Sequence, residues 1–211
     1  MGHYNDSYFD WQKSGGELAG LIDAWKFASY IKQNDKVLDF GCGGGYLLDK
    51  LICYKRYGVE INPKAIKEAQ KKNIEVYKSI DEIPELVDKI ISHHALEHID
   101  CPFLILKKFY DVLKDNGLVI VVVPIDDWRN EKKYIPNDIN QHLYTWTPLL
   151  LSNLLVKAGF KIIKVEILHH AWIPWSRRLY YLLPKKFYHF LCNCWSYLIK
   201  SRQIRIVATK Q

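Results

Sequence analysis

The stretch that decides the fold runs from Val37 to Gly45 and reads Val-Leu-Asp-Phe-Gly-Cys-Gly-Gly-Gly. Its apolar start is typical of a buried strand, and its glycines let the backbone turn sharply and approach a ligand without a Cβ in the way. Residues 46–51 then read as the first turns of a helix. A strand, a glycine turn and a helix in this order indicate the opening of a nucleotide-binding βαβ unit.

The glycine spacing indicates which nucleotide is bound. A dinucleotide fingerprint, G-x-G-x-x-G, would place its third glycine at position 46, which is Tyr46. The pattern here has instead an acidic residue two positions before three alternating glycines: Asp39, Gly41, Gly43 and Gly45. Residues 55–61 contain a second short strand whose last position is Glu60. A carboxylate at this place can accept hydrogen bonds from both hydroxyls of an adenosine ribose.

This arrangement resembles class I S-adenosylmethionine-dependent methyltransferases of the small-molecule type. The resemblance implies S-adenosyl-L-methionine as cofactor, with its methionine end at the glycine turn and its ribose on Glu60. The cofactor-binding residues that it implies are Asp39, Gly41, Cys42, Gly43, Gly45, Glu60, Ile61, Ser79, Ile80 and His93. Where the family usually has an acidic residue for the adenine amino group, this chain has Ser79, so Ser79, a backbone group near Ile80, and Asp81 are alternative contacts.

The composition, 49% hydrophobic and 25% charged, is that of an ordinary globular protein, and 211 residues suit one domain. We expect a Rossmann-like α/β fold, with a seven-stranded, mostly parallel sheet, an antiparallel last strand and helices on both faces. Within residues 1–211 we expect four functional parts: an N-terminal cap and helix (1–34), a cofactor-binding core (35–125), a lid loop (126–146) and an aromatic and basic insertion (171–202).

Local patterns predict where several elements begin and end. Apolar residues at helical spacing indicate a helix from about Glu17 to Ile31, and the aromatic residues within 8–11 either staple it to the sheet or lie over the cofactor mouth. Asn62-Pro63 and Thr147-Pro148 are typical helix starts. Further predictions are a helix from Pro102 to about Lys114 ended by Asn116 and Gly117, and strands over 118–123 (stopped by Pro124), 160–168 and 203–208.

Four titratable residues follow the predicted fourth strand (88–92): His93, His94, Glu97 and His98. The string His94-x-x-Glu97-His98 matches the inverted zincin pattern, but it follows a strand of a cofactor-binding sheet and lacks a third ligand, so we expect no metal. Similar L-E-H strings occur here in many small-molecule methyltransferases; some that act on quinone precursors hold a divalent metal with an acidic residue where this chain has His94. Glu97 and His98 either cap the next helix or act in catalysis with His94.

The connection from residue 125 to 147 is long and rich in aromatic residues, which is typical of a functional lid. Its His142 is the best candidate for a general base, because histidine exchanges protons near neutral pH. The alternative is a structural hydrogen bond that fixes the loop.

Lysine and arginine outnumber aspartate and glutamate by 30 to 23, which gives a net charge of +7. Such a charge suits nucleic acid, an anionic membrane surface or an acidic substrate. Residues 171–202 interleave aromatic and basic residues, and they form a helical cap packed on the sheet edge, a membrane-interface segment or a nucleic-acid surface. We expect no nucleic-acid partner, because the N/D-P-P-Y/F turn of base-methylating enzymes is missing after the fourth strand.

The five cysteines are odd in number and contain no C-x-x-C pair, which argues against a disulfide framework or a zinc finger. The first residues show no signal-peptide pattern, and no stretch approaches the ~18 apolar residues of a membrane span. We therefore expect a cytoplasmic protein, with peripheral contact of residues 171–202 at the inner face of a membrane as an alternative.

These patterns predict a methyltransferase that acts on an oxygen of a small molecule or saccharide. Saccharide, phenolic and lipid-linked acceptors all suit an aromatic and basic lining. Residues 8–12 and 137–144 resemble a group of bacterial methyltransferases that are associated with surface glycans. The alternatives are a non-catalytic cofactor-binding or membrane-associated regulatory module with the same fold, and an RNA methyltransferase.

Overall fold

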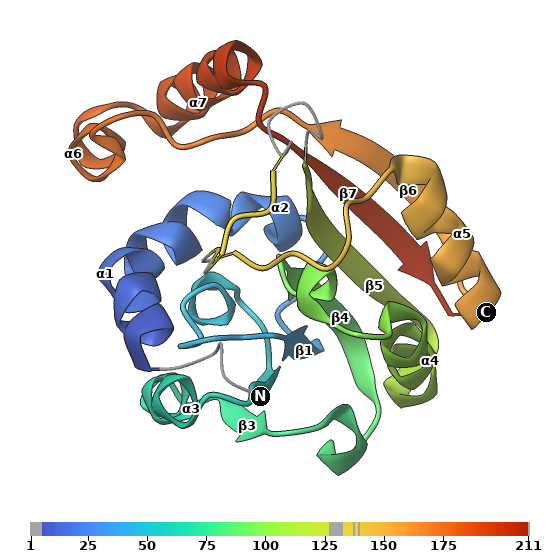
Figure 1. Cartoon of the computed structure of the whole chain (residues 1–211). Coiled ribbons are helices and arrows are strands. Elements are labelled where there is room, and N and C mark those ends of the chain that lie inside the picture. Colours follow the sequence, from blue (N-terminus) through green and yellow to red (C-terminus); the bar gives the residue numbers. More distant parts are fainter. Residues whose placement is uncertain (1–5, 127–132, 137, 139, 211) are drawn as a thin grey trace.

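The computed structural model describes residues 6–126, 133–136, 138 and 140–210, with side chains from Gly15 onward. Its centre is a seven-stranded sheet in the order β3-β2-β1-β4-β5-β7-β6 (Figure 1). The strands are β1 (Lys36–Phe40), β2 (Lys55–Val59), β3 (Glu75–Tyr77), β4 (Val87–His93), β5 (Leu113–Ile125), β6 (Lys161–Leu168) and β7 (Arg202–Thr209). Neighbouring strands are parallel except that β7 runs antiparallel to both β5 and β6. The predicted fold class is confirmed.

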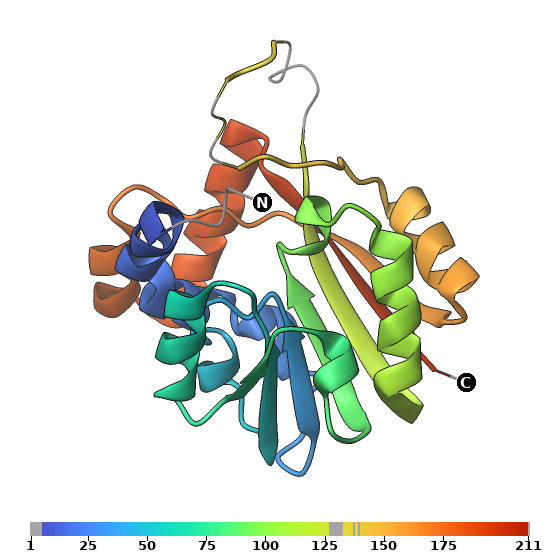
Figure 2. The same cartoon turned by 60° about the horizontal axis from the view of Figure 1, so that its bottom comes forward.

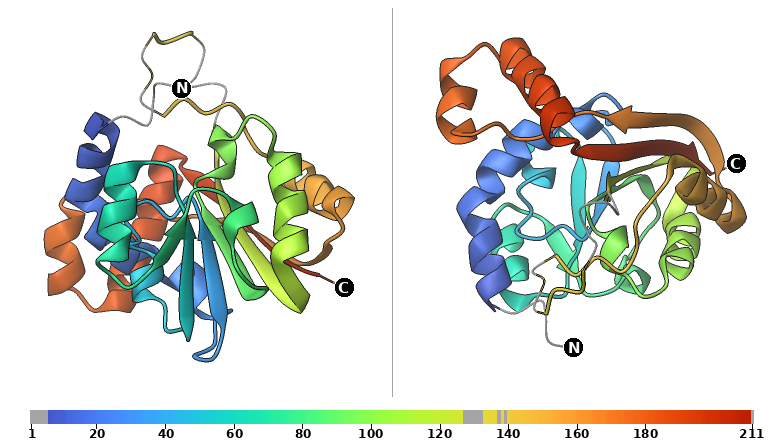
Figure 3. Two further views of the ribbon diagram at one scale, coloured as in Figure 1. Left: turned by 90° about the horizontal axis from the view of Figure 1, so that it is seen from below. Right: turned by 45° about the horizontal axis from the view of Figure 1, so that its top comes forward.

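Helices cover both faces of this sheet, as the left view of Figure 3 shows. One face carries α1 (Asp6–Asp23), α2 (Trp25–Ala28) and α3 (Pro63–Gln70), and the other carries α4 (Pro102–Val112) and α5 (Pro148–Ala158). Three single turns of 3₁₀-helix, η1 (Leu48–Lys50), η2 (Ile80–Glu82) and η3 (Leu96–His98), follow strands. Residues 171–202 form α6 (Ser176–Leu182) and α7 (Lys185–Ile199), which lie beside α1 (Figure 2).

The apolar run in β5 is buried on both faces of the sheet. Val119, Val121 and Val123 pack in the core under α4 and α5, whereas Ile120 and Val122 pack in the core under α2 and α3. Alternate residues of a strand point to opposite faces, so a central strand covered on both faces needs apolar residues at every position. The sheet therefore has two cores, and β5 contributes to both.

Two predicted helix starts are confirmed in detail. The Asn62 side chain accepts a hydrogen bond of 2.9 Å from the backbone N–H of Lys64, and the Thr147 hydroxyl accepts one of 3.1 Å from Leu150. A proline occupies the first helical position in both cases, where its missing N–H costs nothing. At the other end of α5, Gly159 adopts a φ of 112°, the left-handed conformation in which many helices end.

The N-terminal helix differs from its prediction. It begins at Asp6 and ends at Asp23, and α2 follows as a separate turn. A Cβ at Gly16 would lie 2.3 Å from the ring of Tyr46, and a Cβ at Gly20 would lie 2.1 Å from the Tyr46 carbonyl oxygen. These glycines let α1 touch the glycine turn, so they are packing sites inside the helix. The predicted helix over 46–51 is only the turn η1. The prediction for the aromatic residues within 8–11 concerns their side chains, which the structure does not describe.

The predicted ends of α4 and β5 are also wrong. Helix α4 ends at Val112, and Asn116 and Gly117 belong to β5, where the Asn116 N–H donates to the Lys210 carbonyl over 3.0 Å. At its other end β5 continues through Pro124, which pairs with β7. The pairing of β4 with β5 ends at Val122, so the missing N–H of Pro124 costs no hydrogen bond to β4.

The contact between α1 and the glycine turn gives a first prediction. Gly20→Ala places its Cβ against backbone and should lower the free energy of unfolding by about 2 kcal/mol or more. Gly15→Ala is the matched control on the same helix, because its Cβ would lie an ordinary 3.9 Å from Trp172. That change should be neutral or stabilising by about 0.5–1 kcal/mol, since alanine favours helix. Equal effects of both changes in urea titrations would contradict this account.

Candidate active site

The site lies where the connections from the sheet diverge. The chain passes from β1 outward to β2 and β3, and later from β4 outward to β5, so the carboxyl ends of β1 and β4 form the edge at which ligands of such sheets bind. Two cavities meet there. One has a volume of about 530 Å³ and the other about 170 Å³, and both are lined by Gly41 and Gly43. The two cavities thus share the glycine turn as part of their lining.

Most of the predicted site residues line these cavities. The large cavity is lined by Gly41, Gly43, Glu60, Ile61, Ser79, Ile80, His94 and His98, and the small cavity by Asp39, Gly41, Cys42, Gly43 and His93. Gly45 lines neither. Its φ is 72°, and a Cβ on it would lie 2.4 Å from the Ile74 side chain, so Gly45 lets the turn pack against the chain before β3.

Two positions of the glycine turn, Gly41 and Gly43, suit only a residue without a side chain. Gly41 and Gly43 have φ values of 75° and 52°, a region that favours glycine. A Cβ on Gly41 would also lie 2.6 Å from the Cβ of Ala95, which follows β4. The Cys42 side chain fits over Gly58 of β2, where a Cβ would lie 2.5 Å from its sulfur. Burial raises the pKa of the Cys42 thiol well above its usual range, so Cys42 is a packing residue and not a nucleophile.

The Glu60 carboxylate joins the two turns that line the large cavity. One oxygen accepts a hydrogen bond of 2.9 Å from the Gly43 N–H, and the other accepts bonds of 2.8 and 2.9 Å from the N–H groups of Ile61 and Asn62. A carboxylate offers about four lone pairs, so capacity for about one further donor remains. Glu60 therefore both holds the glycine turn in place and presents an acceptor to the cavity.

Three alternative contacts for the adenine came from the sequence: Ser79, a backbone group near Ile80, and Asp81. Asp81 forms an ion pair with Lys108 and accepts a hydrogen bond of 2.9 Å from the Ser79 hydroxyl. Asp81 does not line either cavity, whereas Ser79 and Ile80 line the large one. These observations favour the Ser79 hydroxyl or the backbone at Ile80 over Asp81.

Asp23 and His93 line the small cavity, and both contact the buried Lys26. Lys26 of α2 is buried and forms an ion pair of 2.8 Å with Asp23, and its ammonium lies 3.1 Å from Nε2 of His93. Burial lowers the pKa of Lys26, against the opposing pull of Asp23. Burial and the neighbouring Lys26 also hold the pKa of His93 well below its usual range, so a neutral His93 accepts the hydrogen bond from Lys26. Lys26 ties α2 to the end of β4, and the sequence offered no motif that would have revealed it.

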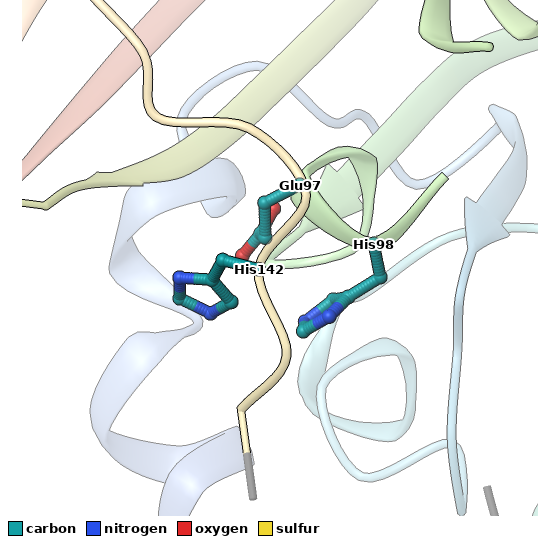
Figure 4. A group of neighbouring side chains, drawn as sticks. All are labelled: Glu97, His98 and His142. Carbon is teal, nitrogen blue, oxygen red and sulfur yellow. The ribbon is translucent and has the colours of Figure 1, made fainter. Parts of the chain in front are cut away.

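Beside the large cavity, three groups from two segments come together (Figure 4). Glu97 and His98 reach from η3 toward His142 of the loop that precedes α5, and their ligand atoms all lie within 4.8 Å of one another. The rings of His98 and His142 are 4.9 Å apart between centroids. Glu97 is fully buried, and its carboxylate oxygens have no hydrogen-bond partner among the described residues. A buried carboxylate without a donor destabilises the protein unless a cation, a protonated group or a ligand meets it.

His142 is oriented by a residue that the sequence analysis did not assign to the site. Its Nδ1 lies 2.8 Å from a carboxylate oxygen of Asp126. Donation from Nδ1 to Asp126 fixes the tautomer in which Nε2 is the proton acceptor. Asp126 comes directly after β5, at the same sheet edge as the residues that follow β4, and this position was a usable signal. The structure thus shows a hydrogen bond of the kind that a structural role of His142 requires. It also places His142 beside His98, which lines the large cavity.

Two hydrogen bonds fasten this end of the loop to η3 and to the residues that follow it. The Leu143 N–H donates to the Glu97 carbonyl over 2.8 Å, and the Tyr144 hydroxyl donates to the Asp100 carbonyl over 2.7 Å. These contacts bring His142 beside His98. Of the predicted lid, residues 127–132, 137 and 139 lie outside the described residues. No residue of 171–202 is among those that line the two cavities, so the role of this segment at the acceptor remains only a prediction.

His94 lies between the cavity and the cluster. It lines the large cavity, and its Nδ1 lies 3.4 Å from a Glu97 oxygen. Its φ of 53° is uncommon for a residue with a side chain. Burial lowers the pKa of His98, which keeps that neighbour neutral at physiological pH.

Asp39 allows a test of the site in the ligand-free protein. Burial, with a smaller contribution from Glu60, raises its pKa from 3.8 to about 7. Between these values the folded protein binds more protons than the unfolded chain, so stability falls as the pH rises through this range. Asp39→Asn should therefore stabilise the ligand-free protein at pH 8 by up to about 4 kcal/mol, and the gain should vanish toward pH 4. A gain that is independent of pH in denaturant titrations would contradict the burial argument.

Comparison with known proteins agrees with this geometry. The family described as a methyltransferase domain matches residues 15–165, and no curated protein matches the chain. Many solved structures share the fold, and the three that follow are each below 25% identity. A SAM-dependent methyltransferase from Archaeoglobus fulgidus aligns over 97% of this chain and 100% of its own, with 22% identity and a TM-score of 0.67. One from Thermotoga maritima, described as a possible histamine N-methyltransferase, aligns over 96% and 94%, with 17% identity and a TM-score of 0.66.

The third is phosphoethanolamine N-methyltransferase 2 from Haemonchus contortus, solved with phosphomonomethylethanolamine and S-adenosylhomocysteine. It aligns over 92% of this chain and 57% of its own, with 14% identity and a TM-score of 0.58. The glycine turn, the carboxylate after β2 and the family match lead to the same conclusion. The chain belongs to the methyltransferase-domain family, and it is a methyltransferase whose cofactor is S-adenosylmethionine.

Proposed function

We propose that this methyltransferase transfers the methyl group to an oxygen of a small molecule or saccharide. The observation that carries the proposal is the Asp126–His142 pair, which lies beside the large cavity with Glu97 and His98. An alcohol or phenol must lose a proton as its oxygen is methylated, and a histidine oriented by a carboxylate suits that task. An amine that arrives unprotonated needs no such base before transfer.

The residues present fit the cofactor. The glycine turn leaves its cradle free of side chains, Glu60 retains acceptor capacity for a ribose hydroxyl, and Asp39 offers a carboxyl group where an ammonium group can lie. We propose that the adenosine half occupies the large cavity, with Ser79 and Ile80 at the adenine, and that the methionine half occupies the small cavity beside His93.

The mechanism follows from the groups that surround the acceptor. Bound S-adenosylmethionine supplies a methyl group that is already electrophilic. Nε2 of His142 takes the proton from the acceptor hydroxyl, while Asp126 holds the Nδ1 proton and stabilises the imidazolium that forms. Glu97, buried beside this ring, adds a second negative charge. The methyl group would pass from the sulfonium of bound S-adenosylmethionine to the acceptor oxygen and leave S-adenosylhomocysteine, and His142 would return its proton to water after the methylated product leaves.

The same cluster separates the proposal from its alternatives. A non-catalytic module with this fold would not need a carboxylate–histidine pair and a buried glutamate without a hydrogen-bond donor beside the cavity. Demethylation of the cofactor should be measured with nucleotide sugars, phenols, lipid-linked saccharides, primary amines and a structured RNA. Turnover with a hydroxyl acceptor is expected. Turnover confined to an amine or to RNA would replace the proposal, and tight cofactor binding without turnover would favour a regulatory module.

Cofactor affinity tests the role of Glu60. Glu60→Ala should weaken binding of both S-adenosylmethionine and S-adenosylhomocysteine by about 10-fold or more, because a ribose contact and the support of the glycine turn are lost together. Glu75→Ala is a suitable control, since Glu75 lies outside both cavities. Isothermal calorimetry, with the unfolding temperature measured alongside, reports both effects. Unchanged affinity would remove Glu60 from the cofactor site.

Turnover tests the role of His142. His142→Ala should reduce turnover by about 10²-fold or more and leave cofactor affinity unchanged, because a general base typically contributes 10²–10⁴-fold. Asp126→Asn should act in the same direction by about 10-fold or more, since the tautomer is then no longer fixed. Tyr134→Ala, at an exposed position of the same loop, is the control.

A chelation series decides whether the cluster works by proton transfer. Glu97, His98 and His142 offer donor types that a divalent cation also accepts. Proton transfer by His142 predicts that turnover survives dialysis against EDTA. Loss of turnover that added Mg²⁺, Mn²⁺ or Zn²⁺ restores would show that the cluster acts as a metal site, and His142 would then be a ligand and not a base.

A further inference from the structure

The charge of this protein is concentrated near its C-terminal end. Residues 167–211 contain eight lysines and arginines and no aspartate or glutamate, whereas the whole chain has 30 basic and 23 acidic residues. This segment thus carries +8, and residues 1–166 together carry −1. Arg205 of β7 is buried and pairs with Glu166, but five of these cations lie on α6, on α7 or at the C-terminal end of α7, and they favour anionic partners.

Helices α6 and α7, called here the C-terminal helical pair, are fixed to the domain by their inner side. Tyr180, Tyr188 and Cys192 form one apolar cluster with Leu18 and Ile22 of α1. The Tyr188 hydroxyl donates a buried hydrogen bond of 2.9 Å that ties α7 to α6. The pair thus has its own small core, and its position beside α1 is visible in Figures 2 and 3.

The outer side of α7 is also apolar. The exposed residues Phe187, Phe190, Tyr197 and Leu198 recur at helical spacing, about half a turn from the side chains that pack on α1. Leu198 is 74% exposed, and the rings of Phe187 and Phe190 stack at 6.4 Å between centroids. A surface helix normally turns polar residues outward, so a second apolar side indicates a partner that takes up apolar groups.

Helix α6 and its start continue the pattern. Trp175 is 81% exposed, and Tyr181 and Leu182 are exposed as well. Exposed cations are distributed over the same two helices and their ends: Arg177, Arg178, Lys185, Lys186 and Lys200. Aromatic and aliphatic side chains mixed with cations, without any acidic residue, are the composition of a segment that lies in a membrane interface.

We propose that the C-terminal helical pair docks on the surface of a bilayer that contains anionic lipids. Its outer apolar side chains enter the boundary between headgroups and acyl chains, and its cations lie near the lipid phosphates. An RNA would also attract the cations and could stack on the aromatic rings. The exposed Leu182, Leu198 and Ile199 offer no ring for a base to stack on, but they gain free energy in a hydrocarbon boundary.

Docking through this pair is peripheral. No helix in the described part of the chain is both long enough and apolar enough to cross a bilayer. None of the residues that line the two cavities belongs to the pair, so changes on its outer side leave the cofactor site intact. The proposal does not depend on which acceptor is methylated, and cofactor affinity provides an independent check that each variant is folded.

Vesicle flotation with the full chain tests the proposal. Vesicles of phosphatidylcholine with one quarter phosphatidylglycerol should bind the protein about 10-fold or more tightly than pure phosphatidylcholine, and 0.5 M salt should weaken this preference. The variant Phe190→Ser/Leu198→Ser keeps the charge and should lose about 10-fold or more in binding. Ile52→Ser/Leu149→Ser removes two equally exposed apolar side chains elsewhere on the surface and should bind as the unchanged protein does.

The remaining outcomes overturn the proposal. Absence of binding to either vesicle would do so, as would equal losses in the two double variants, because the outer side of α7 would then have no special role. Tighter binding to a structured RNA than to anionic vesicles at 0.15 M salt, weakened by Phe190→Ser/Leu198→Ser, would assign the surface to RNA.

A charge variant tests the role of the cations separately. Arg178→Gln/Lys186→Gln should reduce binding to anionic vesicles and leave the weak binding to neutral vesicles unchanged.

Discussion

The Glu60 carboxylate, which accepts hydrogen bonds from Gly43, Ile61 and Asn62, is the interaction on which the site depends. It connects the turn after β1 with the turn after β2 at the edge of the sheet. The glycine turn can approach β2 this closely because Gly41 and Gly43 have no side chain and the Cys42 side chain fits over Gly58, and Glu60 holds the turn there. Both cavities share that turn, so Glu60 lines the large cavity and also holds in place a segment that lines both.

The rest of the domain supports this edge from two sides. On one side Gly16 and Gly20 let α1 lie against Tyr46, and the buried Lys26 joins α2 to His93 at the end of β4. On the other side the loop before α5 is fastened to η3 by the Leu143 N–H, which positions His142. The two turns at the carboxyl ends of β1 and β4 are therefore held by helix packing, a hydrogen bond from the buried Lys26 and loop hydrogen bonds, each supplied by a distant part of the sequence.

The sequence predicted the parts of this structure that depend on local patterns. The glycine turn, the caps at Asn62 and Thr147 and the apolar run 118–123 within β5 each have a short-range physical signature, and the structure has them where they were expected. Boundaries that depend on tertiary contacts were wrong. Pro124 remains in a strand because β4 has already ended beside it, and α1 begins before the predicted Glu17 and contains Gly16, whose missing side chain leaves room for the ring of Tyr46.

The candidate site divides in the same way. Asp39, Gly41, Gly43 and Glu60 follow from spacing and from the resemblance to a known family, and each of them lines one or both cavities. The meeting of Glu97, His98 and His142, and the role of Asp126, depend on how a long loop folds back over η3, and sequence spacing carries no information about that path. Likewise, the apolar outer side of α7 becomes evident only when its inner side is seen to pack on α1.

The most direct measurement is a crystal structure of the protein with S-adenosylhomocysteine. The account predicts that the ribose lies on Glu60, that the amino acid part occupies the small cavity beside Asp39 and His93, and that the sulfur faces the side on which Nε2 of His142 lies. An acceptor hydroxyl placed between that sulfur and His142 would complete the arrangement. A ligand whose sulfur faces away from Glu97, His98 and His142, or that leaves Glu60 without a contact, would contradict it.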